Sequence, residues 1–451
     1  MDILSLFACF ETLMTATSGR QLGIIAHAML TLTGRMTMLS LSRWTEKGGS
    51  YRTLQRFFAT RLPWSKMLVK FFETHLFNPF HEFILAIDAT TVTKAGDLTH
   101  GIGRFFSGVL GQVVKGLEFM VIALVDVTRK KAYPLLVKQT LRSEAEKEAS
   151  KQRKKKKKKR AKKAQTPPRK PRGRPQGSLN KDKMELNLSA ELLRINEMLK
   201  SLLKLLRIFV QVKYLTMDGH FGHNQAVLMA QSNGLHLISK LRRDAKLLEK
   251  YEGNIKNKKY GERINCEAMP RKYLVKTEIE GEIIVNYYQG VFLHQEFGME
   301  LNVVVIVKTD LKKEKVGAVI LFSDDLELGW EKLIEYYSLR FQIEFNFRDA
   351  KQHFGLEDFM NTTEIGVENA ANLAFLMVNV SAKMLTNKGE NCIGINDLKS
   401  QSRGLKYAVE TIKIVLEKAE GILMAEAIEQ VKEKISKIGS IHHRKSAIST
   451  A

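Results

Sequence analysis

Residues 337–351 read YSLRFQIEFNFRDAK, the most informative stretch of the chain because its charged and apolar side chains separate onto two stripes of a helix. The first stripe, at helical spacing, consists of Tyr337, Arg340, Glu344, Arg348 and Lys351. The neighbouring stripe is apolar and consists of Tyr336, Leu339, Ile343, Phe347, Ala350 and Phe354. The pattern predicts one long helix over residues 330–354 that packs on a sheet and offers an acid among cations beside the buried face.

Two apolar runs upstream each lead to an aspartate. Residues 83–87 (FILAI) end directly on Asp88, and residues 214–217 (YLTM) end on Asp218. Short apolar runs of this kind are typical of central strands buried on both faces, so we expect the ends of two strands to hold these carboxylates. An aspartate after a strand is often only a loop cap, and a glutamate flanked by Arg and Lys is usually a solvated face. The acids alone therefore leave both interpretations open.

Three carboxylates at such positions suit two divalent metal ions. One ion activates the attacking oxygen and the other stabilises the leaving oxygen of a phosphodiester. Oxygen ligands favour Mg²⁺, and an arginine beside them can grip a phosphate through two nitrogens. We predict Asp88, Asp218 and Glu344 as the ligands, with Glu344 carried by the helix.

The hydrophobic pattern divides the chain of 451 residues into helical ends and an α/β centre. The order β-β-β-α-β-α-β precedes residue 245, and alternating strands follow as a separate insertion. In chain order, the predicted parts are a helical DNA-binding domain (1–80), the first core strands (81–142), a polybasic disordered insertion (143–183), the core continued (184–246), a β-rich insertion (247–325), the catalytic helix and the helix after it (326–385), and a helical C-terminal region (386–451).

The N-terminal part contains a possible helix-turn-helix. Residues 47–50 (KGGS) separate two helical patterns, Ser50 is placed to cap the second, and Arg52 and Arg56 lie on it. An ordinary helical bundle explains the same pattern equally well.

The formal charge of +24 points to a polyanionic partner, and much of this charge is concentrated in one segment. Residues 151–183 contain 17 Lys and Arg against one Asp. They have too few apolar side chains to offset the entropy of ordering. Within them, PRGRP (171–175) resembles an AT-hook core, whose Arg172 and Arg174 would enter a minor groove. A solvated linker that adds nonspecific phosphate affinity is the alternative.

The cysteines and the hydropathy indicate where the protein acts. Cys9, Cys266 and Cys392 are far apart and suggest neither a zinc site nor a disulfide framework. No apolar run approaches the roughly 20 residues that span a bilayer, and the N-terminus does not resemble a signal peptide. We expect a cytoplasmic protein that stays with its DNA and makes no contact with a membrane.

The spacing Tyr337-x2-Arg340-x3-Glu344-x6-Lys351 resembles the Y-R-E-K signature of bacterial insertion-sequence DDE transposases with a β-rich insertion. AIDATTVTKAG (86–96) resembles the first-aspartate strand of that family, and YLTMDGHFGHNQ (214–225) resembles the second. The resemblance covers roughly residues 1–385. It implies an α/β fold with a ribonuclease-H-like catalytic core that the β-rich insertion interrupts, in a nucleoid-associated bacterial protein.

The resemblance also implies roles for individual residues. Asp88, Asp218 and Glu344 would hold two Mg²⁺ ions, with Mn²⁺ able to substitute, while Tyr337, Arg340 and Lys351, with Arg348 on the same stripe, would contact DNA. The family cuts the terminal inverted repeats of its element, passes through a DNA hairpin, and joins the 3′ end to target DNA, normally as a synaptic homodimer.

A hairpin requires a base to leave the stack, and aromatic side chains stabilise such a base. Trp330 is the candidate, followed by Tyr287 and Tyr288, although core packing explains each of them as well. Two other functions remain open from the sequence: a different metal-dependent DNA nuclease of ribonuclease-H-like fold, and a DNA-binding protein that has lost catalysis.

Overall fold

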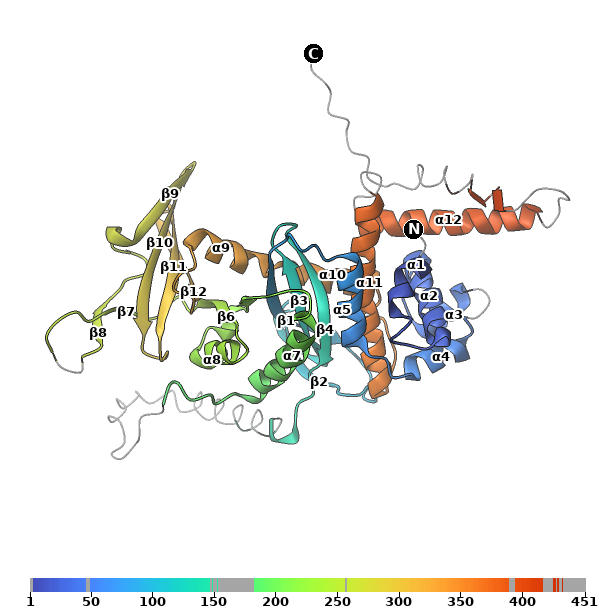
Figure 1. Cartoon of the computed structure of the whole chain (residues 1–451), viewed down its shortest axis with the longest axis horizontal. Helices are drawn as coiled ribbons and strands as arrows, with labels where there is room; N and C mark the ends of the chain where they lie inside the picture. Colours follow the sequence, from blue (N-terminus) through green and yellow to red (C-terminus); the bar gives the residue numbers. More distant parts are fainter. Residues whose placement is uncertain are drawn as a thin grey trace, which may run out of the picture.

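The computed structural model describes residues 3–45, 49–146, 148, 152, 182–255, 258–388, 394–416, 425–426, 428–429 and 432 (Figure 1). Arg172, Arg174 and nearly all of the polybasic segment lie outside these residues, so the AT-hook interpretation stays a prediction. None of the described helices is long and apolar enough to cross a membrane.

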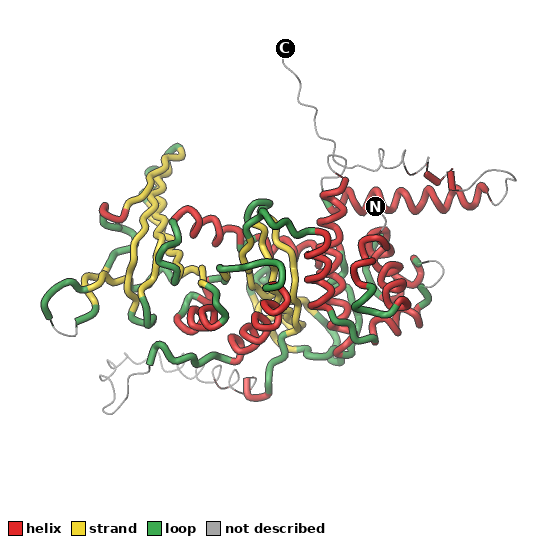
Figure 2. The backbone as a smooth tube through the Cα atoms, viewed as in Figure 1, coloured by secondary structure: helices red, strands yellow, loops and turns green. Residues whose placement is uncertain are grey.

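A mixed sheet forms the centre of the molecule (Figure 2). Its core strands are β1 (Phe83–Thr93), β2 (Gly103–Ser107), β3 (Gln112–Asp126), β4 (Lys131–Gln139), β5 (Tyr214–Thr216) and β6 (His236–Leu241). Strand β1 pairs antiparallel with β3 and parallel with β5, and β5 pairs parallel with β6. With α7 (Ala190–Leu206) and α8 (Asn224–Ser232) this confirms the predicted α/β order, to which the structure adds only β2.

The β-rich insertion continues the same sheet. Its strands are β7 (Leu247–Lys250), β8 (Tyr260–Arg263), β9 (Leu274–Glu280), β10 (Ile283–His294), β11 (Glu300–Asp310) and β12 (Lys315–Ser323). Strand β12 pairs antiparallel with β6, from Ile320 opposite Leu241 to Ser323 opposite Ile238. The prediction of a separate unit was therefore wrong, because the exposed edge of β6 is completed by the returning strand.

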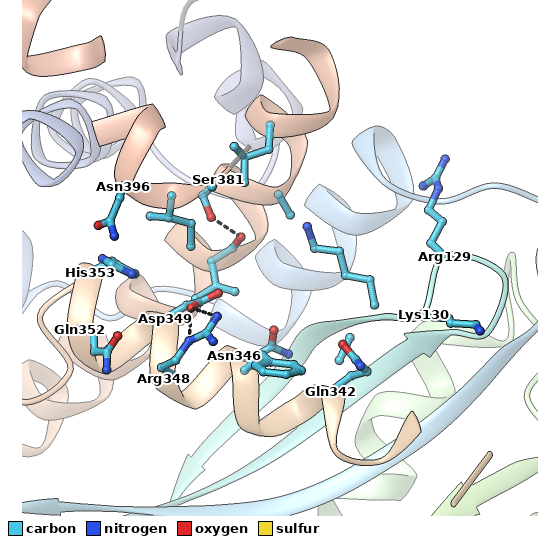
Figure 3. A pocket seen from close by; sticks show the side chains of 18 residues that line it. Arg129, Lys130, Gln342, Asn346, Arg348, Asp349, Gln352, His353, Ser381 and Asn396 are labelled. Atoms are coloured by element: carbon cyan, nitrogen blue, oxygen red, sulfur yellow. Dashed lines mark hydrogen bonds and ion pairs between the residues drawn. The ribbon is translucent and has the colours of Figure 1, made fainter. Parts of the chain in front are cut away.

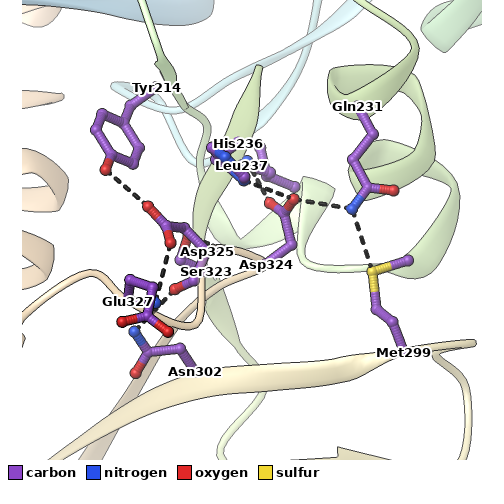
Figure 4. Close-up of polar contacts among 10 residues, drawn as sticks. All are labelled: Tyr214, Gln231, His236, Leu237, Met299, Asn302, Ser323, Asp324, Asp325 and Glu327. Atoms are coloured by element: carbon purple, nitrogen blue, oxygen red, sulfur yellow. Dashed lines mark hydrogen bonds and ion pairs between the residues drawn. The ribbon is translucent and has the colours of Figure 1, made fainter. Parts of the chain in front are cut away.

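Two aspartates after β12 fasten the insertion to the core (Figure 4). The buried carboxylate of Asp324 accepts hydrogen bonds from the Leu237 backbone N–H (2.6 Å) and Gln231 Nε2 (2.9 Å), and it lies 3.1 Å from His236 Nδ1. The Tyr214 hydroxyl donates to Asp325 (2.8 Å). These bonds join β12 to β5, β6 and α8, so the insertion and the core form one continuous sheet.

Helices from the N-terminal and C-terminal parts of the chain pack against the core at strand β4. The N-terminal bundle consists of α1 (Ile3–Phe7), α2 (Ala16–Thr31), α3 (Met38–Trp44) and α4 (Tyr51–Ala59), and α5 (Trp64–His75) leads from it to the sheet. Helix α11 (Glu364–Lys388) contacts α4, α5 and β4, and α12 (Ile395–Leu416) contacts α2. Asn369 of α11 donates to the carbonyls of Phe58 (2.9 Å) and Thr60 (2.8 Å) at the end of α4. The C-terminal helices therefore hold the N-terminal bundle against the core.

The N-terminal helices agree both with a helix-turn-helix and with an ordinary helical bundle. Ser50 caps α4, as predicted, since its Oγ accepts from the Thr53 N–H at 3.3 Å. Arg52 and Arg56 are exposed on α4, while Leu54, Phe57 and Phe58 are buried. The exposed arginines remain available to DNA, and the buried face is what any bundle requires.

The helix predicted over residues 330–354 is two helices, α9 (Trp330–Leu339) and α10 (Gln342–His353). Between them the backbone tightens: the N–H of Phe341 donates to Ser338 O, and that of Ile343 to Arg340 O. Such i→i−3 bonds are typical of a 3₁₀ turn. The apolar stripe is nevertheless buried throughout, as predicted, so the break changes the direction of the helix without exposing its packing face.

Candidate active site

Asp88 and Asp218 lie at the same level of two neighbouring parallel strands. Strand β1 pairs with β5 through Leu85 opposite Leu215 and Ala86 opposite Thr216, and each aspartate follows two residues after the second pair. Adjacent strands are about 4.8 Å apart. The parallel register alone therefore brings the two carboxylates to one place on the sheet.

The two aspartates differ in their local backbone. Strand β1 continues to Thr93, so Asp88 stands within the strand, opposite Val121 of β3, and not at the strand end that its sequence predicted. The antiparallel partner β3 extends the strand through the polar residues 90–93. Asp218 does follow its strand, and it caps a 3₁₀ turn by accepting the His220 N–H at 3.1 Å. Its backbone carbonyl accepts from Ser239 Oγ at 2.8 Å.

Arg340 joins the first acid to the third. Its Nη1 donates to Asp88 Oδ2 at 2.9 Å, and its Nη2 donates to Glu344 Oε1 at 3.3 Å. The side chains of Arg340, Asp88 and Glu344 are 13%, 26% and 40% exposed, so the guanidinium is more deeply enclosed than either carboxylate. Because Arg340 occupies the turn between α9 and α10, it can reach the β1 aspartate while Glu344 lies one turn further along α10.

The charges of all three acids act on one another. Burial raises the pKa of Asp88, Arg340 opposes this, and the negative charges of Asp218 and Glu344 raise it further. Burial also works to lower the pKa of Arg340, but Asp88, Tyr337, Glu344 and Asp218 together raise it. The three acids thus form one electrostatic group around a single cation.

Comparison with protein families shows which family this chain matches. The family described as DDE superfamily endonuclease matches residues 5–278, which is more than half of the chain and includes Asp88 and Asp218. The chain belongs to this family. A transposase DDE domain also matches residues 194–380, which include Asp218 and Glu344. No curated protein matches the chain.

The protein is therefore a DDE transposase, an enzyme whose substrate is DNA and whose class uses divalent metal ions. Its mixed α/β sheet is consistent with the ribonuclease-H-like fold of that class.

The acids of this transposase fit divalent ions by their donor chemistry. All three offer carboxylate oxygens, the ligands that Mg²⁺ prefers, and their mutual repulsion already draws one cation, the Arg340 guanidinium, between two of them. Among the described residues, no three His, Cys, Asp or Glu side chains lie close enough together to hold a metal ion. In this structure Arg340 supplies the positive charge between Asp88 and Glu344.

The other residues of the charged stripe do not all lie with the acids. The guanidinium of Arg340 lies 6.0 Å from the ring of Tyr337. Tyr337 is half-buried, and burial together with the charges of Asp218 and Asp88 raises its pKa. Lys351 donates to the Thr91 carbonyl of β1 at 2.8 Å. Arg348 instead pairs with Asp349 at 3.0 Å and lines a separate cavity. Arg348 follows Glu344 by one turn of the same helix, so its pairing with Asp349, and not the break before α10, takes its guanidinium away from the acids.

Trp330 lies at the other end of α9 from the acids. Its ring packs against that of Tyr287 with centroids 5.4 Å apart, and its backbone N–H donates to Gln289 Oε1 at 3.2 Å. The intervening helix of ten residues is about 15 Å long. Tyr288 packs against the hydrophobic core. Trp330 packs against the same core and is likewise partly buried.

Two groups near the site were not identified from the sequence. His220 Nε2 lies 3.3 Å from the Glu191 carboxylate, beside Asp218, and this pairing raises the pKa of His220. Arg129, Lys130 and Lys131, between β3 and β4, line the same cavity as Arg348. Neither pairing could be found by spacing, since the partners are far apart in the chain.

Proposed function

We propose that this transposase moves an insertion sequence by a cut-and-paste reaction, with Asp88, Asp218 and Glu344 as catalytic metal ligands. The observation that carries the proposal is the register of β1 and β5, which sets the two aspartates side by side, together with Arg340 joining Asp88 to Glu344. Two strand-borne acids and one helix-borne acid are the donor set that two-ion phosphodiester chemistry needs.

The bound ions, Mg²⁺ with Mn²⁺ able to substitute, would activate the attacking oxygen and stabilise the leaving oxygen at the scissile phosphate. The side chains of the chain itself position the DNA. Arg340 presents two nitrogens to the site and can exchange a carboxylate for a phosphate oxygen with the same geometry. Tyr337 and Lys351 border the same group and would hold the adjoining backbone, and β1 and β5 keep the two aspartates fixed.

The partners are the terminal inverted repeats of the element and the target DNA, brought together by a homodimer. Positive charge supports DNA as the partner, since the chain carries a net +24. A hairpin intermediate is included in the proposal. Trp330 is its candidate for stacking on an extruded base, supported by its partly exposed ring at the start of α9.

The experiment uses the full chain with a DNA fragment that carries the inverted repeats flanking its coding region, in the presence of Mg²⁺. We expect cleavage at the element ends, a hairpin, and a product joined to target DNA. Glu344→Gln should abolish cleavage, whereas the matched variant Glu335→Gln, at an exposed position of α9, should cleave normally. Full activity of Glu344→Gln would show that the assignment of the acids is wrong.

The products also separate the two alternatives. A metal-dependent nuclease of the same fold would cut DNA without forming hairpins or joined products. A DNA-binding protein without catalysis would bind the repeats and leave them intact with any divalent ion.

A further inference from the structure

A second basic site lies along α10, beyond the acids. A cavity of about 570 Å³ opens between α10, α11, the start of α12 and the turn that connects β3 to β4 (Figure 3). Arg129, Lys130 and Lys131 of that turn line it, together with Asn346, Arg348 and His353 of α10. This surface takes no part in the acid site described above.

The cavity has more positive than negative charge. Asp349 is the acid that lines it, and both Nε and Nη2 of Arg348 already donate to its Oδ1 at 3.0 Å. Arg129 is partly engaged elsewhere, through the Leu76 carbonyl (3.1 Å) and Asp126 (4.0 Å). Burial lowers the pKa of Lys131, and Asp349 opposes this only in part. The pKa of His353 is likewise lowered by burial. Asp349 is the one carboxylate among the lining residues, so the basic groups outnumber the acids of the cavity wall.

A buried donor in the wall points to the same kind of ligand. Asn346 is 5% exposed, and its Nδ2 has no hydrogen-bond partner within the described part of the chain. An unpaired buried amide N–H costs about 1–3 kcal/mol. An anion in this cavity offers the acceptor that the protein does not.

The backbone of Lys130 has an unfavourable conformation. Its φ is +53°, a left-handed conformation that suits Gly or Asn and costs a lysine on the order of 1 kcal/mol. The turn therefore holds a cation at the mouth of the cavity at the expense of local stability.

We propose that this cavity binds a phosphate of the DNA backbone and thereby forms a second DNA contact on the catalytic helix. The proposal rests on the proposed function, because DNA held at Glu344 must pass close to α10. Arg348 is four residues beyond Glu344, or about 6 Å along the helix, and each DNA strand carries a phosphate for about every 3.4 Å of its axis. A strand at the acids therefore has further phosphates within reach of the cavity.

The test is Lys130→Gly in the full chain, measured by fluorescence anisotropy with duplex DNA over a series of salt concentrations. Loss of one phosphate contact should weaken binding about five- to ten-fold and lower the log–log salt slope by about 0.9. The melting temperature should stay the same or rise, because glycine relieves the left-handed strain. Lys130→Arg should bind as wild type does.

Glu314→Gly is the matched control, since Glu314 also has a positive φ, +50°, in the turn between β11 and β12. It changes the backbone in the same way without removing a cation, so it should not weaken DNA binding. Unchanged affinity and slope in Lys130→Gly would overturn the proposal.

A second arm separates DNA from free phosphate as the source of the anion. Inorganic phosphate at millimolar concentration should compete with DNA for the wild type and less for Lys130→Gly. Phosphate could raise the melting temperature of the wild type but not of Lys130→Gly, while both proteins bind DNA equally well. The site then takes a free anion, and the proposal is wrong. Failure of the proposed function looks different, because then DNA would bind through the cavity and no variant, including the wild type, would cleave it.

Discussion

Replacing Arg340 with methionine tests whether the three acids depend on one cation. The variant keeps most of the side-chain volume but removes the 2.9 Å bond to Asp88 and the 3.3 Å bond to Glu344. Three mutually repelling carboxylates then remain, one of them with a pKa already raised by burial and by Asp218 and Glu344 despite the presence of Arg340. We expect the folded state without divalent metal to lose stability.

The expected loss is about 2 kcal/mol. Removing one partner of a fully buried ion pair costs about 3–5 kcal/mol, but Asp88 and Glu344 are 26% and 40% exposed, and water screens part of their charge. For a chain of 451 residues the loss corresponds to a melting temperature lower by about 2 °C. Differential scanning fluorimetry in a chelating buffer measures it. Lys332→Met provides the control, because its pair with Glu82 is exposed on both sides and should be worth less than about 1 kcal/mol.

Addition of Mg²⁺ makes the test specific to the acids. The wild type has a guanidinium among its carboxylates and should be stabilised little, whereas Arg340→Met should regain stability as Mg²⁺ concentration rises. Arg340→Met combined with Glu344→Gln should recover part of the loss without metal, because one repelling charge is gone. If Arg340→Met melts like the wild type in the chelating buffer, or gains no more than the wild type from Mg²⁺, the reasoning is refuted.

Three further predictions concern other parts of the chain. Burial, together with Arg403, lowers the pKa of Lys399 from 10.5 to about 7, so the unfolded chain binds more protons between these values. The free energy of unfolding should therefore rise with pH across that window by on the order of 3 kcal/mol, and chemical denaturation should show no such rise in Lys399→Met. Asp324→Ala leaves the donors of Gln231 and Leu237 unpaired and should cost about 3 kcal/mol in the same assay; an unchanged midpoint would mean that the insertion is anchored elsewhere. Deletion of residues 151–174 should weaken binding to all DNA sequences and flatten its salt dependence by about 0.9 per lost phosphate contact, and an unchanged slope would show that the segment does not touch DNA.

The sequence was sufficient for the order of the core elements because burial leaves a local signature. Strands buried on both faces require continuous apolar runs, and such runs marked β1, β3 and β5. The buried stripe of α9 and α10 was equally visible, from Tyr336 to Phe354. The end of β1 was missed, because the polar residues after Asp88 are held in the strand by pairing with β3, which is a tertiary effect.

The site could be predicted only as far as helical spacing is a reliable guide. Spacing correctly places Arg348 one turn after Glu344 on α10, but it does not show that the Arg348 guanidinium pairs with Asp349 and lines a separate cavity. Helical spacing carries no information about which neighbour a long side chain will pair with. The cavity that contains Lys130 was invisible for another reason, since its two walls are more than 200 residues apart in the chain and meet only through the packing of α10 on β4.

Arg340 and Lys130 should act at different stages of DNA binding. Arg340 already donates to two carboxylates, so a phosphate can take its nitrogens only when the charge of those acids is balanced in another way. Lys130, exposed at the cavity, has no such commitment within the described residues. DNA affinity without metal should therefore depend on Lys130 and hardly on Arg340, whereas the metal-dependent step should depend on Arg340. The order follows from charge balance alone, because a cation held by two acids binds a third anion more weakly than Lys130, which has no ion pair within the described residues.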